Sequence, residues 1–311
     1  MSASIPTVPL NDRRGIPVIG FGTGSALYGK DATAYVVQAL EGGFNHIDTA
    51  QAYRNEASVG EALRKALGRT PTLYGNEKID LEKQTLGNVR REDIWITTKY
   101  GGNGNAEDAL DSSLEKLGLP SVDLYLIHNP RVTNDIVKTW SELESAHSHG
   151  KAKSIGVSNF SVEQLKLVIE HGKVVPSVNQ IRFHPYNYHE NVELLEFAKK
   201  HNIVIESYSG LTPITKLPGG KLDNVLANIA SRLGPKATPA QVIMQWIRAK
   251  GVVVVTTTSR RERIQEYLGI FGLPDLTEDE ITAIDEAARD PPSAEMFFVI
   301  ALVLSSFMFS L

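Results

Sequence analysis

The chain has 311 residues, with 36 Asp and Glu against 32 Lys and Arg, a net formal charge of −4 and no cysteine. The absence of cysteine excludes disulfides, a thiol nucleophile and a thiolate metal site. The mildly acidic balance argues against a nucleic-acid partner, which would require a basic surface. The first ten residues, MSASIPTVPL, lack the basic and apolar runs of a signal peptide, so we expect a cytoplasmic protein. His147 and His149 have no carboxylate or Cys partner nearby and are interpreted as surface histidines, so no metal site is expected.

The order of elements along the chain begins with Ile5–Pro17, where turn-forming residues between short apolar pieces predict a β-hairpin. Short apolar segments then alternate with amphipathic ones. Eight strands are predicted, at Val18–Gly22, Phe44–Asp48, Ile94–Lys99, Val122–His128, Ser154–Ser158, Ser177–Arg182, Ile203–Tyr208 and Val252–Thr257. Helices are predicted at Thr33–Leu40, Ala57–Leu67, Ala106–Leu117, Ile136–Ala146 and Val192–His201.

Three further helix starts are predicted by capping boxes. Ser161, Thr238 and Thr277 are each followed three residues later by Gln or Glu. Pro239 occupies the favoured first helical position. The last of these boxes predicts an extra C-terminal helix, after the eighth strand.

Eight strands that alternate with helices predict a parallel sheet with right-handed crossovers. At this length a closed (β/α)8 barrel, with the hairpin closing its floor, is the economical arrangement. An open doubly wound sheet is the alternative, but it normally carries G-x-G-x-x-G after the first strand. The glycines Gly20, Gly22 and Gly24 do not have that spacing, so we expect a single (β/α)8 barrel domain over residues 1–290.

Two segments interrupt the alternation. Residues 69–91 form a polar insertion between the second helix and the third strand, and a connection of this length is either functional or disordered. The C-terminal tail, residues 291–311, ends in the apolar stretch Met296–Leu311. As a helix that stretch would span about 24 Å, less than the ~30 Å hydrocarbon core. It is interpreted as a weak membrane anchor facing the cytosol, as a packing element, or as an aberrant terminus.

The candidate site residues lie at the carboxyl ends of the predicted strands, where the active sites of barrels are found. In chain order they are Asp48, Lys99, His128, Ser158, Asn159, Gln180, Tyr208 and Thr256–Ser259, with Tyr53 five residues after Asp48. Asp, Tyr, Lys and His together suit proton donation to a carbonyl oxygen while hydride reaches its carbon. The ammonium of Lys99 would lower the pKa of the Tyr53 phenol, and His128 would orient the carbonyl.

These motifs resemble the aldo-keto reductases. The segments that carry the resemblance are GFNHIDTAQAY, ITTK, LYLIHNP, GVSNF and the Asn-Gln pair, all in order over about 280 residues between Val8 and Arg289. The likeness is greatest to the fungal ketoreductase and α-dicarbonyl reductase branch, given SYSGLTPITK and VVVVTTTSRRERIQEYL. It implies NADPH-dependent reduction of aldehydes or ketones, with Tyr53 as the general acid and Asp48, Lys99 and His128 completing a tetrad.

The resemblance also implies a set of cofactor-binding residues. Ser158, Asn159 and Gln180 would hold the nicotinamide carboxamide, and Tyr208 would stack on the ring. The adenosine phosphate would be bound in the loop after the eighth strand by Thr258, Ser259, Arg260 and Arg263, with Arg261 close by. Because this loop lacks the lysine of the family's common Pro-Lys-Ser, arginines alone carry the expected preference for NADP.

The sequence therefore predicts an enzyme that acts on small carbonyl compounds. The resemblance suggests α-dicarbonyls, keto esters or lactones, aldehydes or sugars, and a monomer is expected. The alternative is a cofactor-binding regulatory subunit on the same barrel, tethered through Met296–Leu311. An intact tetrad favours the enzyme, because a sensor need not keep all four groups.

Overall fold

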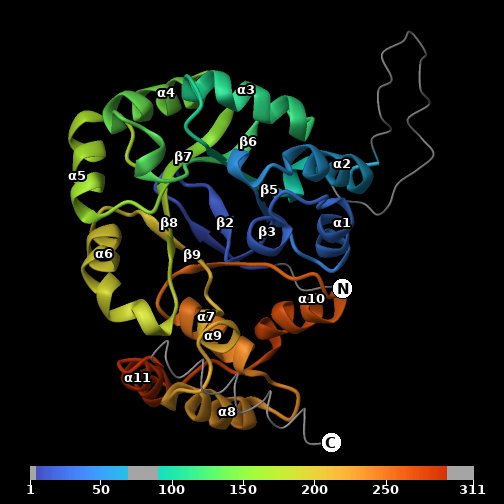
Figure 1. Ribbon diagram of the computed structural model, residues 1–311, viewed down its shortest axis with the longest axis vertical. Coiled ribbons are helices and arrows are strands. Elements are labelled where there is room, and N and C mark those ends of the chain that lie inside the picture. The colour runs from blue at the N-terminus through green and yellow to red at the C-terminus, as the bar shows by residue number, and fades with distance from the viewer. Residues whose placement is uncertain (1–4, 69–89, 293–311) are drawn as a thin grey trace, which may run out of the picture.

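The fold is a closed barrel of eight parallel strands, described in the computed structural model over residues 5–68 and 90–292. Figure 1 views the barrel close to end-on, with the helices in a ring around the strands. The strands are β3 (Ile19–Gly22), β4 (His46–Asp48), β5 (Trp95–Tyr100), β6 (Val122–Ile127), β7 (Ala152–Ser158), β8 (Val178–Arg182), β9 (Val204–Tyr208) and β10 (Val253–Thr256). The barrel closes through parallel pairing of β10 with β3, which excludes the open doubly wound sheet.

The helices of the described residues cover the outside of the barrel. They are α1 (Thr33–Glu41), α2 (Glu56–Ala66), α3 (Ala106–Leu117), α4 (Ile136–Ser148), α5 (Val162–His171), α6 (Tyr188–Lys200), α7 (Thr212–Thr215), α8 (Lys221–Leu233), α9 (Pro239–Ala249), α10 (Arg261–Leu268) and α11 (Glu278–Ala287). The predicted C-terminal helix is α11, which packs against α8. Every predicted helix and strand is present and differs only at its ends; α6, for example, begins four residues before the predicted start because Pro185–Asn187 leads directly into it. The helices α7, α8 and α10 were not predicted.

The capping boxes lie where the sequence predicts them. The hydroxyls of Ser161, Thr238 and Thr277 each accept a hydrogen bond from the backbone N–H three residues on, and the side chain at that position bonds back to the cap. Two unsatisfied donors are thereby paired at each helix start. Ser161 caps the helix that follows the loop after β7, whereas Thr238 and Thr277 cap helices that follow other helices.

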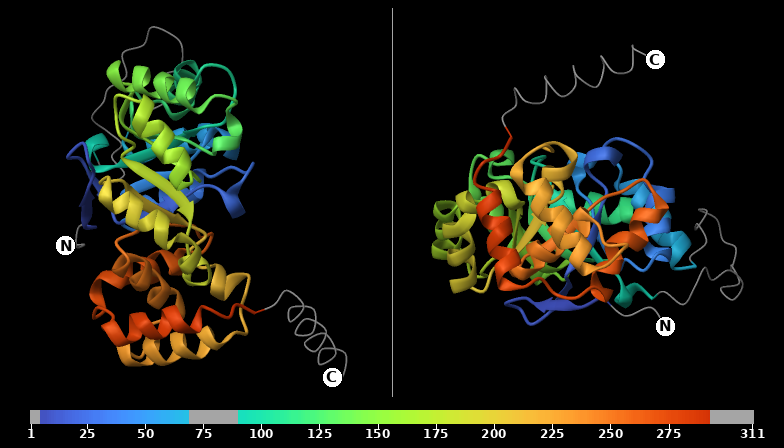
Figure 2. Two further views of the ribbon diagram at one scale, coloured as in Figure 1. Left: turned by 90° about the vertical axis from the view of Figure 1, so that its left-hand side faces the viewer. Right: turned by 90° about the horizontal axis from the view of Figure 1, so that it is seen from below.

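The hairpin of β1 (Thr7–Pro9) and β2 (Gly15–Pro17) closes the amino end of the barrel, as expected. Figure 2 shows it as a small dark-blue sheet at one end of the molecule. Leu10 and Ile16 pack inside the floor against Trp95 and Val253. This apolar plug leaves the opposite, carboxyl end as the place for a site.

Two predicted segments lie largely outside the described residues. Of the insertion, only Arg90 and Arg91 are described; Arg91 begins a short 3-10 turn and contacts Asp123 on the floor. The apolar stretch Met296–Leu311 lies entirely outside the described residues, so its three interpretations stay as predictions. In residues 5–68 and 90–292, no helix combines the length and the apolar character needed to cross a bilayer.

Candidate active site

The predicted tetrad comes together at the carboxyl end of the barrel. Asp48 ends β4, Lys99 lies in β5, and Tyr53 closes the short turn Gln51–Tyr53 after β4. Lys99 Nζ lies 2.6 and 2.7 Å from the two carboxylate oxygens of Asp48 and 3.3 Å from the Tyr53 hydroxyl. The His128 ring, just after β6, meets the Tyr53 ring edge to face at 5.4 Å between centroids.

The ion pair of Asp48 and Lys99 is fully enclosed, with 2 % and 0 % of the side chains exposed. Burial alone would lower the pKa of Lys99, but the charge of Asp48 and its hydrogen bonds to the ammonium raise that pKa overall. Lys99 also donates to the Thr49 carbonyl oxygen at 2.9 Å. Because an ammonium has only donors, the Tyr53 oxygen must accept from Lys99, and the phenol's own proton is left free for another partner.

The pKa of Tyr53 differs from the expectation. Burial raises it above its ordinary value, and the charge of Lys99 lowers it only part of the way back. The predicted effect of Lys99 is present, but desolvation of the phenolate is larger. The phenol therefore stays protonated at neutral pH, which is the form that an acid requires.

His128 is a neutral imidazole at neutral pH. Burial lowers its pKa to about 4, and the nearby Lys99 charge adds to that effect. A neutral ring can donate one hydrogen bond without placing a second positive charge beside Lys99. That suits a group that orients a carbonyl oxygen.

The four residues expected to contact the nicotinamide lie side by side, but they bond to one another. The Tyr208 hydroxyl donates to Asn159 Oδ1 at 2.8 Å, and Asn159 Nδ2 donates to the Ser158 hydroxyl at 3.0 Å. Ser158 in turn donates to the Gln180 carbonyl oxygen at 2.7 Å. Asn159 has a positive φ of 62°, a conformation that Asn tolerates better than most residues.

Gln180 faces the barrel interior more than was expected. Its Nε2 donates to Asp48 Oδ2 and to Glu206 Oε2, both at 2.8 Å. Glu206, on β9, is fully buried, and its other oxygen lies 3.7 Å from His46 Nε2. Burial, with the charge of Asp48, raises the pKa of Glu206 to about 8. Sequence reasoning missed Glu206, and the only signal was an acid inside the apolar run Ile203–Tyr208.

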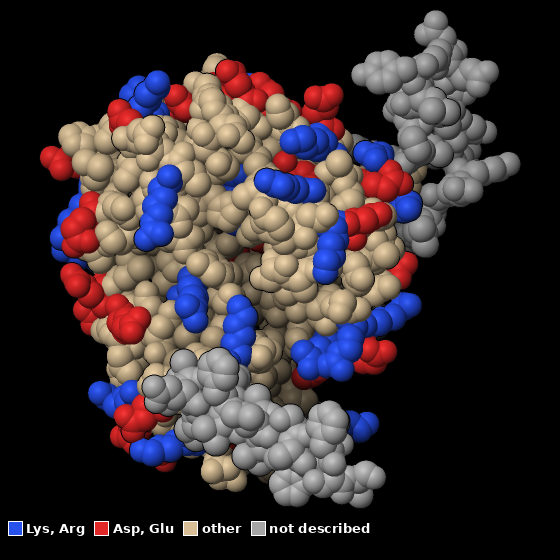
Figure 3. Space-filling model, in the orientation of Figure 1, with Lys and Arg blue, Asp and Glu red and all other residues tan. Residues whose placement is uncertain are grey.

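A cleft of about 230 Å³ opens beside the tetrad. Asp48, Tyr53 and Tyr208 line one part of it, and Lys216 and Arg263 another. Gly24 forms part of its wall, and a Cβ there would lie 2.9 Å from the Tyr53 ring. Figure 3 shows this face of the molecule, with a hollow at its centre. The segment from Ser209 to Lys216, which includes α7, also lines the cleft and was not predicted to do so.

The predicted phosphate loop lies at the β10 end of this cleft. Arg263 lines the cleft, whereas Arg261 lies 3.5 Å from Glu41 on α1. The Thr258 hydroxyl accepts from the Arg260 N–H at 3.0 Å, so it shapes the turn that leads into α10. Ser259 and Arg260 are exposed on the same turn. The structure thus places Thr258, Ser259 and Arg260 on one turn and Arg263 at the start of α10, where it lines the cleft.

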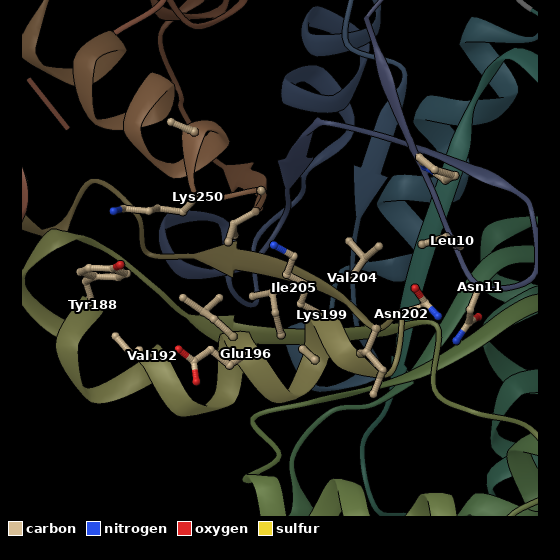
Figure 4. Close-up of a pocket in the computed structure, with 17 residues that line it drawn as sticks. Leu10, Asn11, Tyr188, Val192, Glu196, Lys199, Asn202, Val204, Ile205 and Lys250 are labelled. Carbon is tan, nitrogen blue, oxygen red and sulfur yellow. The ribbon is translucent and has the colours of Figure 1, made fainter. Parts of the chain in front are cut away.

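A larger groove of about 760 Å³ lies at the opposite end, between α6 and α9 and beside the hairpin loop. Figure 4 shows Val192, Val204, Ile205 and Lys199 along it, with Lys250 to one side. Lys250 is held by Asp285 at 2.6 Å and lies over the Tyr188 ring. No member of the tetrad lines this groove, so the cleft at the carboxyl end is the candidate active site.

Comparison with known proteins agrees with this geometry. A model of the aldo/keto reductase family matches residues 18–289. The chain is 32 % identical over 311 residues to the NADPH-dependent alpha-keto amide reductase of Saccharomyces cerevisiae, covering 93 % of each protein. It is 35 % identical over 315 residues to the D/L-glyceraldehyde reductase of Hypocrea jecorina, covering 92 % of this chain and 88 % of that protein. The crystal structure of a Bombyx mori aldo-keto reductase in complex with NADP matches with a TM-score of 0.76 and 29 % identity, over 91 % of this chain and 93 % of the other. The chain therefore belongs to the aldo/keto reductase family of oxidoreductases.

Proposed function

We propose that this protein reduces aldehydes and ketones to alcohols with NADPH, and that Tyr53 is the general acid. The observation that carries the proposal is the direction of the hydrogen bond between Lys99 and the Tyr53 hydroxyl. Lys99 Nζ, 3.3 Å away, can only donate, so the phenol proton is available to a carbonyl oxygen in the cleft. The raised pKa of Tyr53 keeps that proton in place until a substrate oxygen gains negative charge.

The residues of the cleft fit a nicotinamide dinucleotide. Lys216 and Arg263 supply cations for its phosphates, and the Tyr208 ring supplies an aromatic face for the nicotinamide. Ser158, Asn159 and Gln180 form the wall beside Tyr208, where the carboxamide would replace bonds that these residues make to one another. The bound cofactor supplies hydride, and the chain supplies its position and the proton.

The other tetrad members hold the acid in its working state. Asp48 keeps Lys99 charged and fixed, since both of its carboxylate oxygens lie within 2.7 Å of the ammonium. His128, neutral and packed against the Tyr53 ring, would donate to the same carbonyl oxygen and fix its direction. Holding carbonyl, acid and cofactor in one geometry supplies much of the rate enhancement.

For substrates we propose the small carbonyl compounds suggested by the fungal resemblance, namely α-dicarbonyls, keto esters or lactones, aldehydes and sugars. The names of the yeast and Hypocrea relatives support the first and third groups. The regulatory alternative depended on the tail, which lies outside the described residues. The tetrad and its proton-donating geometry favour the enzyme.

The test is replacement of Tyr53 by Phe, which removes the proton and leaves the ring. Turnover of an aromatic aldehyde with NADPH should fall by roughly 10²- to 10⁴-fold, the usual contribution of a general acid. Binding of NADPH, followed by quenching of protein fluorescence, should persist. Tyr35→Phe on α1 is the matched control and should retain full turnover. Unchanged turnover in Tyr53→Phe would remove Tyr53 as the acid.

A further inference from the structure

The loops around the mouth of the barrel carry an excess of positive charge. Outside the α-helices and strands these loops contain five cations against two acids, in a chain whose net charge is −4. The cations are Lys30, Arg54, Arg131, Lys216 and Arg260. Figure 3 shows Lys and Arg side chains spaced around the central hollow, with Asp and Glu mainly toward the outer edge of this face.

The two acids of these loops are already engaged. Asp31 accepts a hydrogen bond from the backbone N–H of Thr33 at 2.8 Å, and Asp135 accepts from that of Lys138 at 3.0 Å. Both carboxylates therefore serve helix starts. Among residues 5–68 and 90–292, neither Arg54 nor Arg131 forms an ion pair.

Four of these cations fall into two groups, one on the side of the cleft assigned to the cofactor and one beside Tyr53 and His128. Lys216 and Arg260 lie in the loops after β9 and β10, on the side of the cleft assigned to the cofactor phosphates. Arg54 directly follows Tyr53, and Arg131 lies three residues after His128. The loops that carry the proposed acid and the proposed carbonyl-orienting imidazole thus each contain an exposed arginine at the carboxyl end of the barrel.

The loop that carries Arg131 is braced. The Asn129 side chain accepts from the Arg131 N–H at 2.9 Å, which fixes the turn Pro130–Val132. The β5 loop packs tightly against this turn, since a Cβ on Gly102 would lie 2.6 Å from the Val132 carbonyl oxygen. A guanidinium on a fixed turn loses less conformational freedom when it binds, and its planar fork matches a carboxylate or a phosphate.

We propose that the substrate is an anionic carbonyl compound, and that Arg54 and Arg131 bind its carboxylate or phosphate group while the carbonyl lies between Tyr53 and His128. This inference rests on the proposed reductase function and narrows its substrate class. Positive charge around the mouth also attracts such anions from solution and raises the association rate, an effect that salt screens.

The experiment compares pairs of related aldehydes, in each of which one member carries an anionic group and the other is neutral. The carboxylate arm uses 4-carboxybenzaldehyde and its neutral amide, 4-carbamoylbenzaldehyde; the phosphate arm uses glyceraldehyde 3-phosphate and glyceraldehyde. The measured quantity is the ratio of kcat/KM for the anion to that for its neutral partner, with NADPH saturating. We expect a ratio of about ten or more at low ionic strength in the arm that matches the natural anion, and a steep fall in 0.5 M salt.

The variants separate recognition from general damage. Arg54→Gln, Arg131→Gln and the double variant should lower the ratio, by roughly tenfold for the double. Lys173→Gln, at an exposed lysine just after α5, makes the same change in net charge as either single variant and should leave the ratio unaltered. Titration with NADPH should give the same affinity in all of them, because both arginines lie away from the cofactor side.

The outcomes distinguish the two proposals. One outcome is turnover of the neutral aldehydes with a kcat/KM ratio near one that neither arginine variant changes. It would overturn the proposal of an anionic substrate and leave the proposed reductase function intact. Absence of turnover with every aldehyde, in a protein that binds NADPH, would overturn the reductase and this inference with it. A preference for one arm that the arginine variants abolish identifies the anion as carboxylate or phosphate.

Discussion

The buried carboxyl group of Glu206 makes the stability of this barrel depend on pH in a definite direction. Its pKa is about 8 in the folded protein, because burial and the charge of Asp48 disfavour the carboxylate, against an ordinary 4.5. Between these values the folded state holds a proton that the unfolded chain has released. Folding stability therefore falls as pH rises through this window. Replacement by Gln removes the titration and keeps the shape and the acceptor oxygen.

The magnitude follows from the linkage relation, in which each pKa unit corresponds to about 1.4 kcal/mol. From pH 5 to pH 7.5, the free energy of unfolding of Glu206→Gln should increase relative to that of the wild type by on the order of 3 kcal/mol. His46 and His128, whose pKa values burial lowers to about 4, also make stability pH-dependent. Glu206 is not among the main causes of either shift, so the contributions of the two histidines cancel in the difference.

Urea unfolding at pH 5, 6, 7 and 7.5 measures that difference directly. Glu193→Gln on the exposed face of α6 is the matched control, and its difference from the wild type should stay flat across the same range. A difference in the free energy of unfolding between Glu206→Gln and the wild type that is the same at all four pH values would refute the reasoning. It would mean that Glu206 ionises in the folded protein as it does in water.

Two further changes test other parts of the structure. Asp123→Asn should lower the free energy of unfolding by about 2–3 kcal/mol in urea titrations, because its carboxylate is 5 % exposed and is contacted by three cations from different elements. The control is Asp111→Asn: the Asp111 side chain is 52 % exposed, and its replacement should change the free energy of unfolding by less than about 0.5 kcal/mol. Gly24→Ala should lower kcat/KM for an aromatic aldehyde by roughly 10- to 100-fold by displacing the Tyr53 ring. Gly272→Ala, where a Cβ meets open space, should leave kcat/KM unchanged, and equal values for the two variants would show that the ring yields without consequence.

The barrel and the tetrad could be predicted because both depend on local patterns. Parallel strands buried on both faces are short apolar runs, and a polar residue where such a run ends must lie at the mouth. Asp48, Lys99 and His128 could be located in this way. The capping boxes at Ser161 and Thr238 depend on four consecutive residues, so they too could be read without knowledge of the fold.

The features that the sequence did not reveal depend on closure of the barrel. Glu206 meets Gln180, which in turn reaches Asp48, only because β9, β8 and β4 line the same interior. Nothing in the run Ile203–Tyr208 indicates that partnership. The direction of the Gln180 amide and the net pKa of Tyr53 depend in the same way on how much water the folded barrel excludes.

Leu10 and Ile16 seal the floor beneath the polar side chains of the barrel interior. We therefore expect these side chains, among them Glu206 and Lys99, to exchange protons with bulk water through the carboxyl end of the barrel. A ligand that fills the mouth isolates them, and the number of protons they hold is then fixed until it leaves. Under the proposed reaction, Tyr53 regains the proton that it donates only after the alcohol departs. Reprotonation of Tyr53 then accompanies product release, and we expect a solvent isotope effect on that step as well as on the chemical step.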